Sequence, residues 1–132
     1  MKNHDLKAET QDLATLVIKP GMGESEASPW MKMLAPFNQC MLGVVRFCGR
    51  TPWERHPDGD ELLHVLEGAV EVTVLADSGP SDTTVAAGSI FVVPRGLWHR
   101  QTAASPVTLL FATAADSTEH TWDEAPPPIV ST

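Results

Sequence analysis

The chain has 132 residues, a length that fits one domain with its own hydrophobic core and is short for two. The 17 acidic residues outnumber the 9 Lys and Arg residues, so the net charge is −8, and no basic cluster is present. This balance argues against nucleic acid and anionic membrane as partners. The N-terminus lacks the apolar run of a secretory signal, and no stretch reaches the roughly 20 apolar residues of a membrane span. We therefore expect a cytoplasmic protein in which Cys40 and Cys48 stay reduced.

The first third of the chain predicts strands joined to irregular segments. Residues 1–12 are polar and are expected to be loose. Residues 13–18 have the β-branched content of a short strand. Residues 21–36 show no clean period and are expected to form an arm that lies across the barrel or across a partner subunit. Residues 37–47 predict a longer strand, in which Gly43 indicates a bulge or a close backbone approach.

The rest of the chain predicts short strands separated by turns. Val70, Val72 and Val74 alternate with polar residues, and the segments 62–66, 70–74, 83–86, 89–93, 98–102 and 107–113 all have strand character. No segment after residue 37 has a convincing helical period. These features favour an all-β jelly-roll barrel. The predicted organisation is an N-terminal arm with a short strand over residues 1–36, a barrel over 37–115 and a Pro-rich surface tail over 116–132.

The segment from Trp53 to Glu61 carries the chemistry of interest. Side chains alternate in a strand, so Glu54 and His56 point to the same face. The turn at residues 57–60 can bring Glu61 back beside them. If a later strand delivers His99 to the same place, two imidazoles and at least one carboxylate share a small volume. That is the outline of a metal site.

Two motifs in this part of the chain resemble those of small single-domain cupins. The first is Glu54-Arg55-His56, a turn, Glu61 and, after six further residues, Gly68. The second is Gly88, then Pro94-Arg95-Gly96, then His99. Together the motifs cover roughly residues 49–103. The resemblance is specific for the fold and not for a reaction, because this fold hosts many chemistries.

The resemblance implies a double-stranded β-helix with one divalent metal ion held by His56, Glu61 and His99. Such a set suits Fe(II) with open positions and is compatible with Mn, Ni, Co or Zn. The chain departs from the cupin pattern at Glu54, where a first histidine is usual, and at Ala103, where Asn is frequent. Glu54 is a fourth metal ligand, an outer acceptor or general base, or a side chain that faces water after loss of the metal.

Parity along the strands assigns directions to other notable side chains. His64 should face away from Glu61. Trp53 and Trp98 should point outward and pack under the N-terminal arm or a second subunit. Gln101 shares the parity of His99, and both a cavity-facing and a surface-facing position are open. His4 and His120 lie in polar ends of the chain and are expected to be solvated.

Three functional classes are consistent with the sequence. The first is a metal-dependent enzyme of oxygenase, isomerase or lyase type that acts on a small polar molecule, with Glu54 as the candidate catalytic residue. The second is a non-catalytic cupin that binds or senses a small ligand. The third is a structural barrel without metal. A homodimer is also expected, because the resemblance and the apolar arm with Trp30 provide a surface for pairing.

Overall fold

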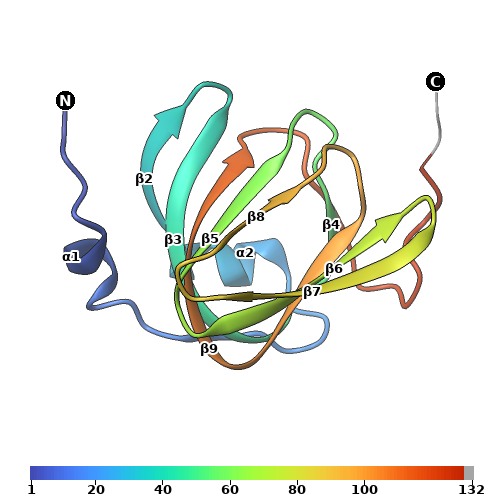
Figure 1. Cartoon of the computed structure of the whole chain (residues 1–132), viewed down its shortest axis with the longest axis horizontal. Coiled ribbons are helices and arrows are strands. Elements are labelled where there is room, and N and C mark those ends of the chain that lie inside the picture. The colour runs from blue at the N-terminus through green and yellow to red at the C-terminus, as the bar shows by residue number, and fades with distance from the viewer. Residues whose placement is uncertain (130–132) are drawn as a thin grey trace.

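Short strands joined by tight turns form two stacked layers that close into a jelly-roll barrel (Figure 1). The computed structural model describes residues 1–129, and residues 130–132, the end of the predicted tail, lie outside them. The fold confirms the predicted double-stranded β-helix. The strands are β1 (Leu16–Val17), β2 (Lys32–Phe37), β3 (Cys40–Arg50), β4 (Trp53–Arg55), β5 (Glu61–Glu67), β6 (Ala69–Ala76), β7 (Gly79–Ala86), β8 (Ile90–Val93), β9 (His99–Ala114) and β10 (Glu119–Thr121).

The long strand β9 joins the two layers. Its C-terminal part pairs with β3 and β5, and β2 and β8 lie beyond these partners. Its N-terminal part pairs with β6 and β4, and β7 and β10 lie beyond those. The sequence predicts two strands, over residues 98–102 and 107–113, where the structure has one. Pairing with β3 continues through a register shift between Phe47 and Gly49, which lets β9 pass from one layer to the other.

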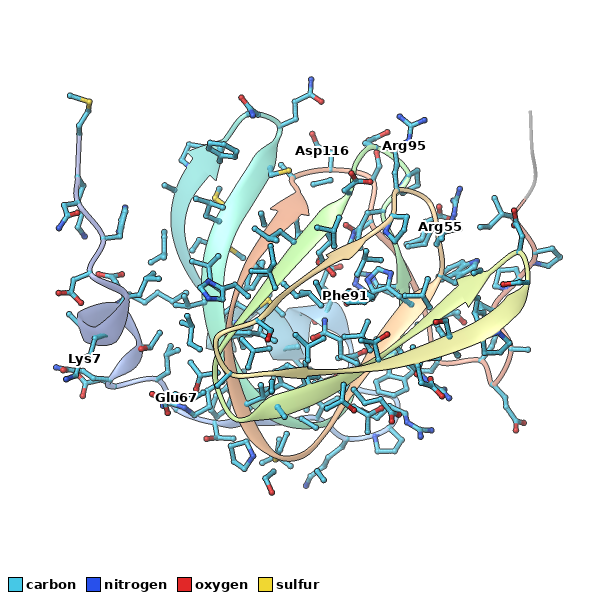
Figure 2. The ribbon with its side chains drawn as sticks, viewed as in Figure 1. Lys7, Arg55, Glu67, Phe91, Arg95 and Asp116 are labelled. Carbon is cyan, nitrogen blue, oxygen red and sulfur yellow. The ribbon has the colours of Figure 1, made fainter. Side chains whose placement is uncertain are left out.

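The barrel core follows the period-two pattern of β5 and β6. Leu63, Val65, Val70 and Val72 are at most 1% exposed, so one face of each strand is fully buried. Phe91 of β8 packs against this core (Figure 2). The close approach predicted at Gly43 is present, because a Cβ there would lie 2.5 Å from Cζ of Phe111. Bulky side chains therefore fill the space between the layers.

The expectation that residues 1–12 are loose is wrong for the part that forms a helix. Leu6–Thr10 forms the helix α1, which lies outside the barrel beside β2 and β3 (Figure 1). The side chain of Asp5 caps α1 by accepting a hydrogen bond from the N–H of Ala8 at 3.1 Å. Arg46 of β3 donates a hydrogen bond to the carbonyl of Thr10 at 3.1 Å. A local cap and one distant arginine thus order this polar segment.

The N-terminal arm lies across the barrel of its own chain. The helix α2 (Glu24–Ala27) and the 3₁₀ helix η1 (Ser28–Trp30) precede β2, and Ile18, Met22, Ala27 and Met31 pack against the core. Within residues 1–129 every helix precedes residue 37, as the sequence predicts. None of the helices in that range has the length and apolar character needed to cross a membrane.

The C-terminal segment covers the two outward tryptophans. Trp53 and Trp98 are each 5% exposed, and their indole N–H groups donate to the carbonyls of Glu124 at 3.3 Å and Pro127 at 2.9 Å. The prediction that they pack under the N-terminal arm or a second subunit is therefore wrong. A third indole, that of Trp122, donates to the carbonyl of Met22 at 2.9 Å and joins this segment to the arm.

Candidate metal centre

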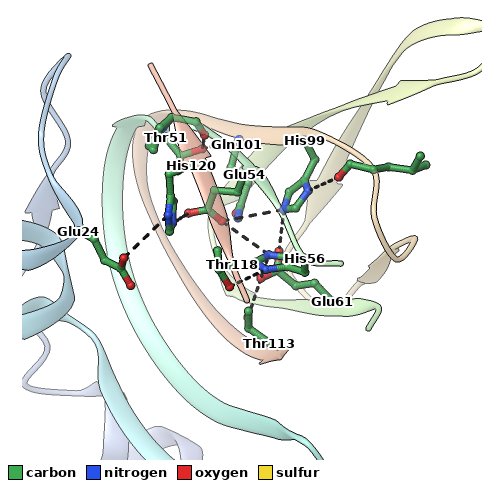
Figure 3. A network of polar contacts seen from close by, with 12 residues as sticks. Glu24, Thr51, Glu54, His56, Glu61, His99, Gln101, Thr113, Thr118 and His120 are labelled. Carbon is green, nitrogen blue, oxygen red and sulfur yellow. Dashed lines mark hydrogen bonds and ion pairs between the residues drawn. The ribbon is translucent and has the colours of Figure 1, made fainter. Parts of the chain in front are cut away.

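Four titratable side chains meet inside the barrel (Figure 3). Glu54 lies on β4, His56 follows this strand, Glu61 begins β5 and His99 begins β9. One donor atom from each of the four lies within 4.8 Å of the others. His56, Glu61 and His99 are at most 4% exposed, whereas the Glu54 side chain is 21% exposed. The structure thus brings together all four residues that the sequence predicts for the site.

Backbone pairing and one turn produce this convergence. Glu54 and His99 are register partners in antiparallel strands, so their side chains project to the same side. The turn at residues 57–60 is fastened to the second motif, since Asp60 accepts the N–H of Arg95 at 2.8 Å. The N–H of Gly96 also donates to the carbonyl of His56 at 3.0 Å. These bonds hold Glu61 and His56 opposite β9.

Arg55 strengthens the same region from the outer face of β4. Its Nε donates to the carbonyl of Gly96 at 2.8 Å, and its guanidinium pairs with Glu119 of β10. Figure 2 shows Arg55 close to the loop that carries Arg95. Both cupin-like motifs and the C-terminal strand are therefore tied together at one arginine.

The Glu61 carboxylate lies between the two imidazole rings. Its Oε2 is 3.2 Å from Nε2 of His56, and its Oε1 is 3.2 Å from Nε2 of His99. The hydroxyl of Thr113 donates to Oε2 of Glu61 at 2.6 Å. Glu54 is farther away, with its Oε2 at 3.8 Å and 4.0 Å from the same two nitrogen atoms. Three donors thus form a tight group, and the fourth lies on its more exposed side.

Both histidines direct Nε2 at the cluster and keep Nδ1 for a fixed partner. Nδ1 of His99 donates to the carbonyl of Leu97 at 3.0 Å, which assigns the proton to Nδ1 and the lone pair of the neutral ring to Nε2. Nδ1 of His56 contacts the hydroxyl of Thr118 at 3.0 Å. Nε2 of His56 is buried and has no hydrogen-bond partner among the described residues. Metal-binding histidines are oriented by contacts of this kind.

The cluster carries negative charge without a nearby basic side chain. Burial alone raises the pKa of Glu61, but the close contacts with the His56 and His99 rings outweigh it and hold the pKa well below its usual range. Burial alone lowers the pKa of His99, but the hydrogen bond and charge of Glu61 raise it above its usual value. Within residues 1–129, no Lys or Arg lies within 4.0 Å of Glu54 or Glu61. These four side chains could together hold a metal ion.

His120 is a neighbour of the site that the sequence expectation missed. It is the register partner of Glu54 on β10, and its Nε2 lies 3.2 Å from Oε1 of Glu54. Its Nδ1 lies 3.9 Å from Glu24 of α2. The hydrogen bond to Glu54 raises the pKa of His120 against the opposing effect of burial. The one available signal was the alternation of Thr118, His120 and Trp122, which places all three on one face of an extended segment.

A cavity of about 730 Å³ extends from the cluster beneath the N-terminal arm. Gln101 lines this cavity and is only 8% exposed. Of the cavity-facing and surface-facing positions that the sequence left open, the structure therefore has the cavity-facing one. Ala103, where a cupin frequently has Asn, is buried at 2% exposure. His64 alternates away from Glu61, as predicted, because Glu61, Leu63 and Val65 form the buried face of β5. The volume lies in the range of small-molecule sites.

The fold and this cluster define a jelly-roll protein with a candidate metal centre inside the barrel. Residues 48–113, half of the chain, match the family model described as Cupin domain, and the chain belongs to the cupin family. This confirms the resemblance carried by the two motifs.

The similar proteins include a germin-like protein, a dioxygenase and a solved cupin-2 domain protein. Germin-like protein subfamily 2 member 2 of Arabidopsis thaliana is 31% identical over 73% of this chain and 47% of its own length. Acireductone dioxygenase of Rhodopseudomonas palustris is 46% identical over 39% of this chain and 32% of its own length. A solved cupin-2 domain protein of Shewanella frigidimarina is 25% identical over 64% of this chain and 78% of its own, with a TM-score of 0.56. The chain spans less than half of these two curated relatives.

Proposed function

We propose that His56, Glu61 and His99 bind one divalent metal ion. The observation that carries the proposal is the meeting of two Nε2 atoms and an ionised carboxylate in a buried site without Lys or Arg. Fe, Mn, Ni, Co and Zn all accept such nitrogen and oxygen donors. Such an ion polarises a bound substrate oxygen or, if redox-active, exchanges electrons with it.

Glu54 modulates this site in the proposal and is the candidate catalytic residue. Its Oε2 faces the two histidines at 3.8 Å and 4.0 Å, while its Oε1 is held by His120. The carboxylate can therefore supply a fourth ligand, which would bind through oxygen, or accept a proton from a molecule bound at the site.

In this proposal, the protein is a metal-dependent enzyme of oxygenase, isomerase or lyase type that acts on a small molecule with a polar group. The similarity to an acireductone dioxygenase, over 39% of the chain, supports metal chemistry on this barrel. A non-catalytic cupin that holds a small ligand is the second candidate. It is favoured by the cavity, whose lining within residues 1–129 has only Glu24, Glu54 and His120 as acid-base groups outside the proposed ligand set.

A turnover measurement distinguishes the enzyme from the non-catalytic binding protein. Metal-loaded protein is incubated with a mixture of small metabolites, and mass spectrometry follows both bound and free molecules. An enzyme depletes one compound far beyond the protein concentration, and Glu54→Gln slows that depletion. A binding protein retains a compound unchanged in stoichiometric amount. His64→Ala, which alters a histidine that faces away from the site, serves as the matched control.

We also propose that the protein is a cytoplasmic homodimer. The outward tryptophans no longer support dimerisation, since the chain covers them itself. Exposed apolar side chains at the two edges of one layer support it instead. Met33 and Phe37 of β2 are 50% and 58% exposed, and Ile90 and Val92 of β8 are 63% and 49% exposed. Cys40 and Cys48 are free thiols, in keeping with a reducing compartment.

A further inference from the structure

The cavity beside the candidate metal centre has a polar end and an apolar end. Glu54, His56 and Glu61 line the polar end. Away from them, the wall consists largely of aliphatic, aromatic and methionine side chains, among them Phe47 and Phe111. Methionine adapts its shape to apolar groups and contacts aromatic rings favourably, so this wall suits a hydrocarbon body more than a fully polar one. The ligand must therefore match two different surfaces.

Gln101 supplies an unused hydrogen-bond acceptor in the same cavity. Its Oε1 is buried and has no partner among the described residues. Its backbone is fixed, because Thr51 donates to its carbonyl at 2.9 Å and the Gln101 N–H donates to the Thr51 hydroxyl at 2.9 Å. Gln101 lies two positions after His99 on β9, so both side chains point inward, and Figure 3 shows Gln101 with Glu54 and His99 in the polar network.

A buried acceptor without a partner is costly and rare in folded proteins. A protein partner for Oε1 is absent within residues 1–129, and Gln101 is one of the residues that line the cavity. A ligand with an O–H or N–H group would complete its hydrogen bonding. The donor must belong to the polar end of the ligand, because Gln101 shares its strand face with His99.

We propose that the cavity binds a small amphipathic molecule, which has an apolar body against the methionine and phenylalanine wall and a hydroxyl or amine group that donates to Oε1 of Gln101. Gln101 is then a specificity-determining residue. The assignment deepens the proposed function, since a metal ion would bind the same polar end, and it narrows the substrate class from small polar molecules to amphipathic ones.

Three neutral probes test the two parts of this assignment by ligand-observed NMR, on zinc-loaded and on metal-free protein. Hexane-1,2-diol has both an apolar body and donors, ethane-1,2-diol lacks the body, and 1,2-dimethoxyhexane lacks the donors. We expect hexane-1,2-diol to bind about 10-fold or more tightly than ethane-1,2-diol, because its additional methylenes are buried. In Gln101→Met, the preference for hexane-1,2-diol over 1,2-dimethoxyhexane should fall by about 3- to 10-fold, the loss of one hydrogen bond.

Two further variants complete the experiment. Gln101→Glu retains an acceptor oxygen and should keep the preference for the diol, and Gln39→Met, the same change at an exposed turn, should leave all affinities unchanged. Equal binding of the two diols, or absence of binding by all three probes, overturns the amphipathic assignment without any variant. An unchanged preference in Gln101→Met overturns the role of Gln101. If zinc fails to bind while metal-free protein shows the expected preferences, the metal proposal fails and this assignment stands.

Discussion

Replacing Glu54 and replacing His99 should weaken metal binding by very different amounts. His99 has its Nε2 in the tight group with Glu61 at 3.2 Å, whereas Oε2 of Glu54 is about 4 Å from both histidines. Changes to residues around a metal site typically cost about 10- to 100-fold in affinity, and loss of a direct ligand costs more. We expect Glu54→Gln to weaken binding about 10-fold and His99→Ala more than 100-fold.

These factors convert into a measurable stabilisation. At a metal concentration about 100 times the Kd of the unmodified protein, bound metal adds about 2.7 kcal/mol to the free energy of unfolding. At the same concentration, the same relation leaves about 1.4 kcal/mol for Glu54→Gln and about 0.4 kcal/mol or less for His99→Ala. Urea unfolding with and without metal measures each difference. His64→Ala should retain the full stabilisation, because His64 points to the other face of β5.

The distances predict that His99→Ala loses more of the metal-dependent stabilisation than Glu54→Gln. If Glu54→Gln loses as much stabilisation as His99→Ala, Glu54 is a full ligand and the distinction drawn from the distances is wrong. If His99→Ala retains the stabilisation of the unmodified protein, the metal does not bind at this cluster.

Three further predictions concern stability and association. In metal-free protein, the lowered pKa of Glu61 stabilises the fold above about pH 4.5, and this contribution is lost as the pH falls. The raised pKa of His99 stabilises the fold below about pH 6.5, and this contribution is lost as the pH rises. The free energy of unfolding in urea should therefore be highest between these two pH values, and a steady rise to pH 8 would contradict the reasoning. Truncation after Ala115 should uncover Trp53 and Trp98 and red-shift their fluorescence, and an unchanged spectrum would show that the tail does not cover them. Light scattering should give the mass of a dimer. A strictly monomeric mass at high protein concentration would contradict the proposed dimer.

Most of the four-residue cluster was predictable because the geometry of Glu54, His56 and Glu61 is local. Alternation places Glu54 and His56 on one face, and the turn at residues 57–60 returns Glu61 to them. The Gly and Pro spacing before His99 supplied the fourth position through the resemblance to cupins. Parity also gave the outward direction of His64, whereas for Gln101 it left a cavity-facing and a surface-facing position open, and the structure selects the first.

The contributions of the chain ends were not predictable in the same way. His120 reaches Glu54 through the pairing of β10 with β4, which connects residues far apart in the sequence and leaves no local period to read. The cover over Trp53 and the order of α1 likewise depend on distant partners, a carbonyl at Glu124 and the side chain of Arg46. The division at residues 36 and 115 therefore stays a prediction.

Elemental analysis of the purified protein measures whether one metal ion is bound at the proposed centre. Protein prepared without added metal, and again after incubation with Fe, Mn, Ni, Co or Zn and removal of the excess, is compared with His56→Ala and His99→Ala. We predict one divalent ion per chain in the unmodified protein, lost from both variants and released at acid pH as the histidines protonate. An unmodified chain that stays empty with every metal, or variants that keep the full content, would contradict a metal centre at His56, Glu61 and His99.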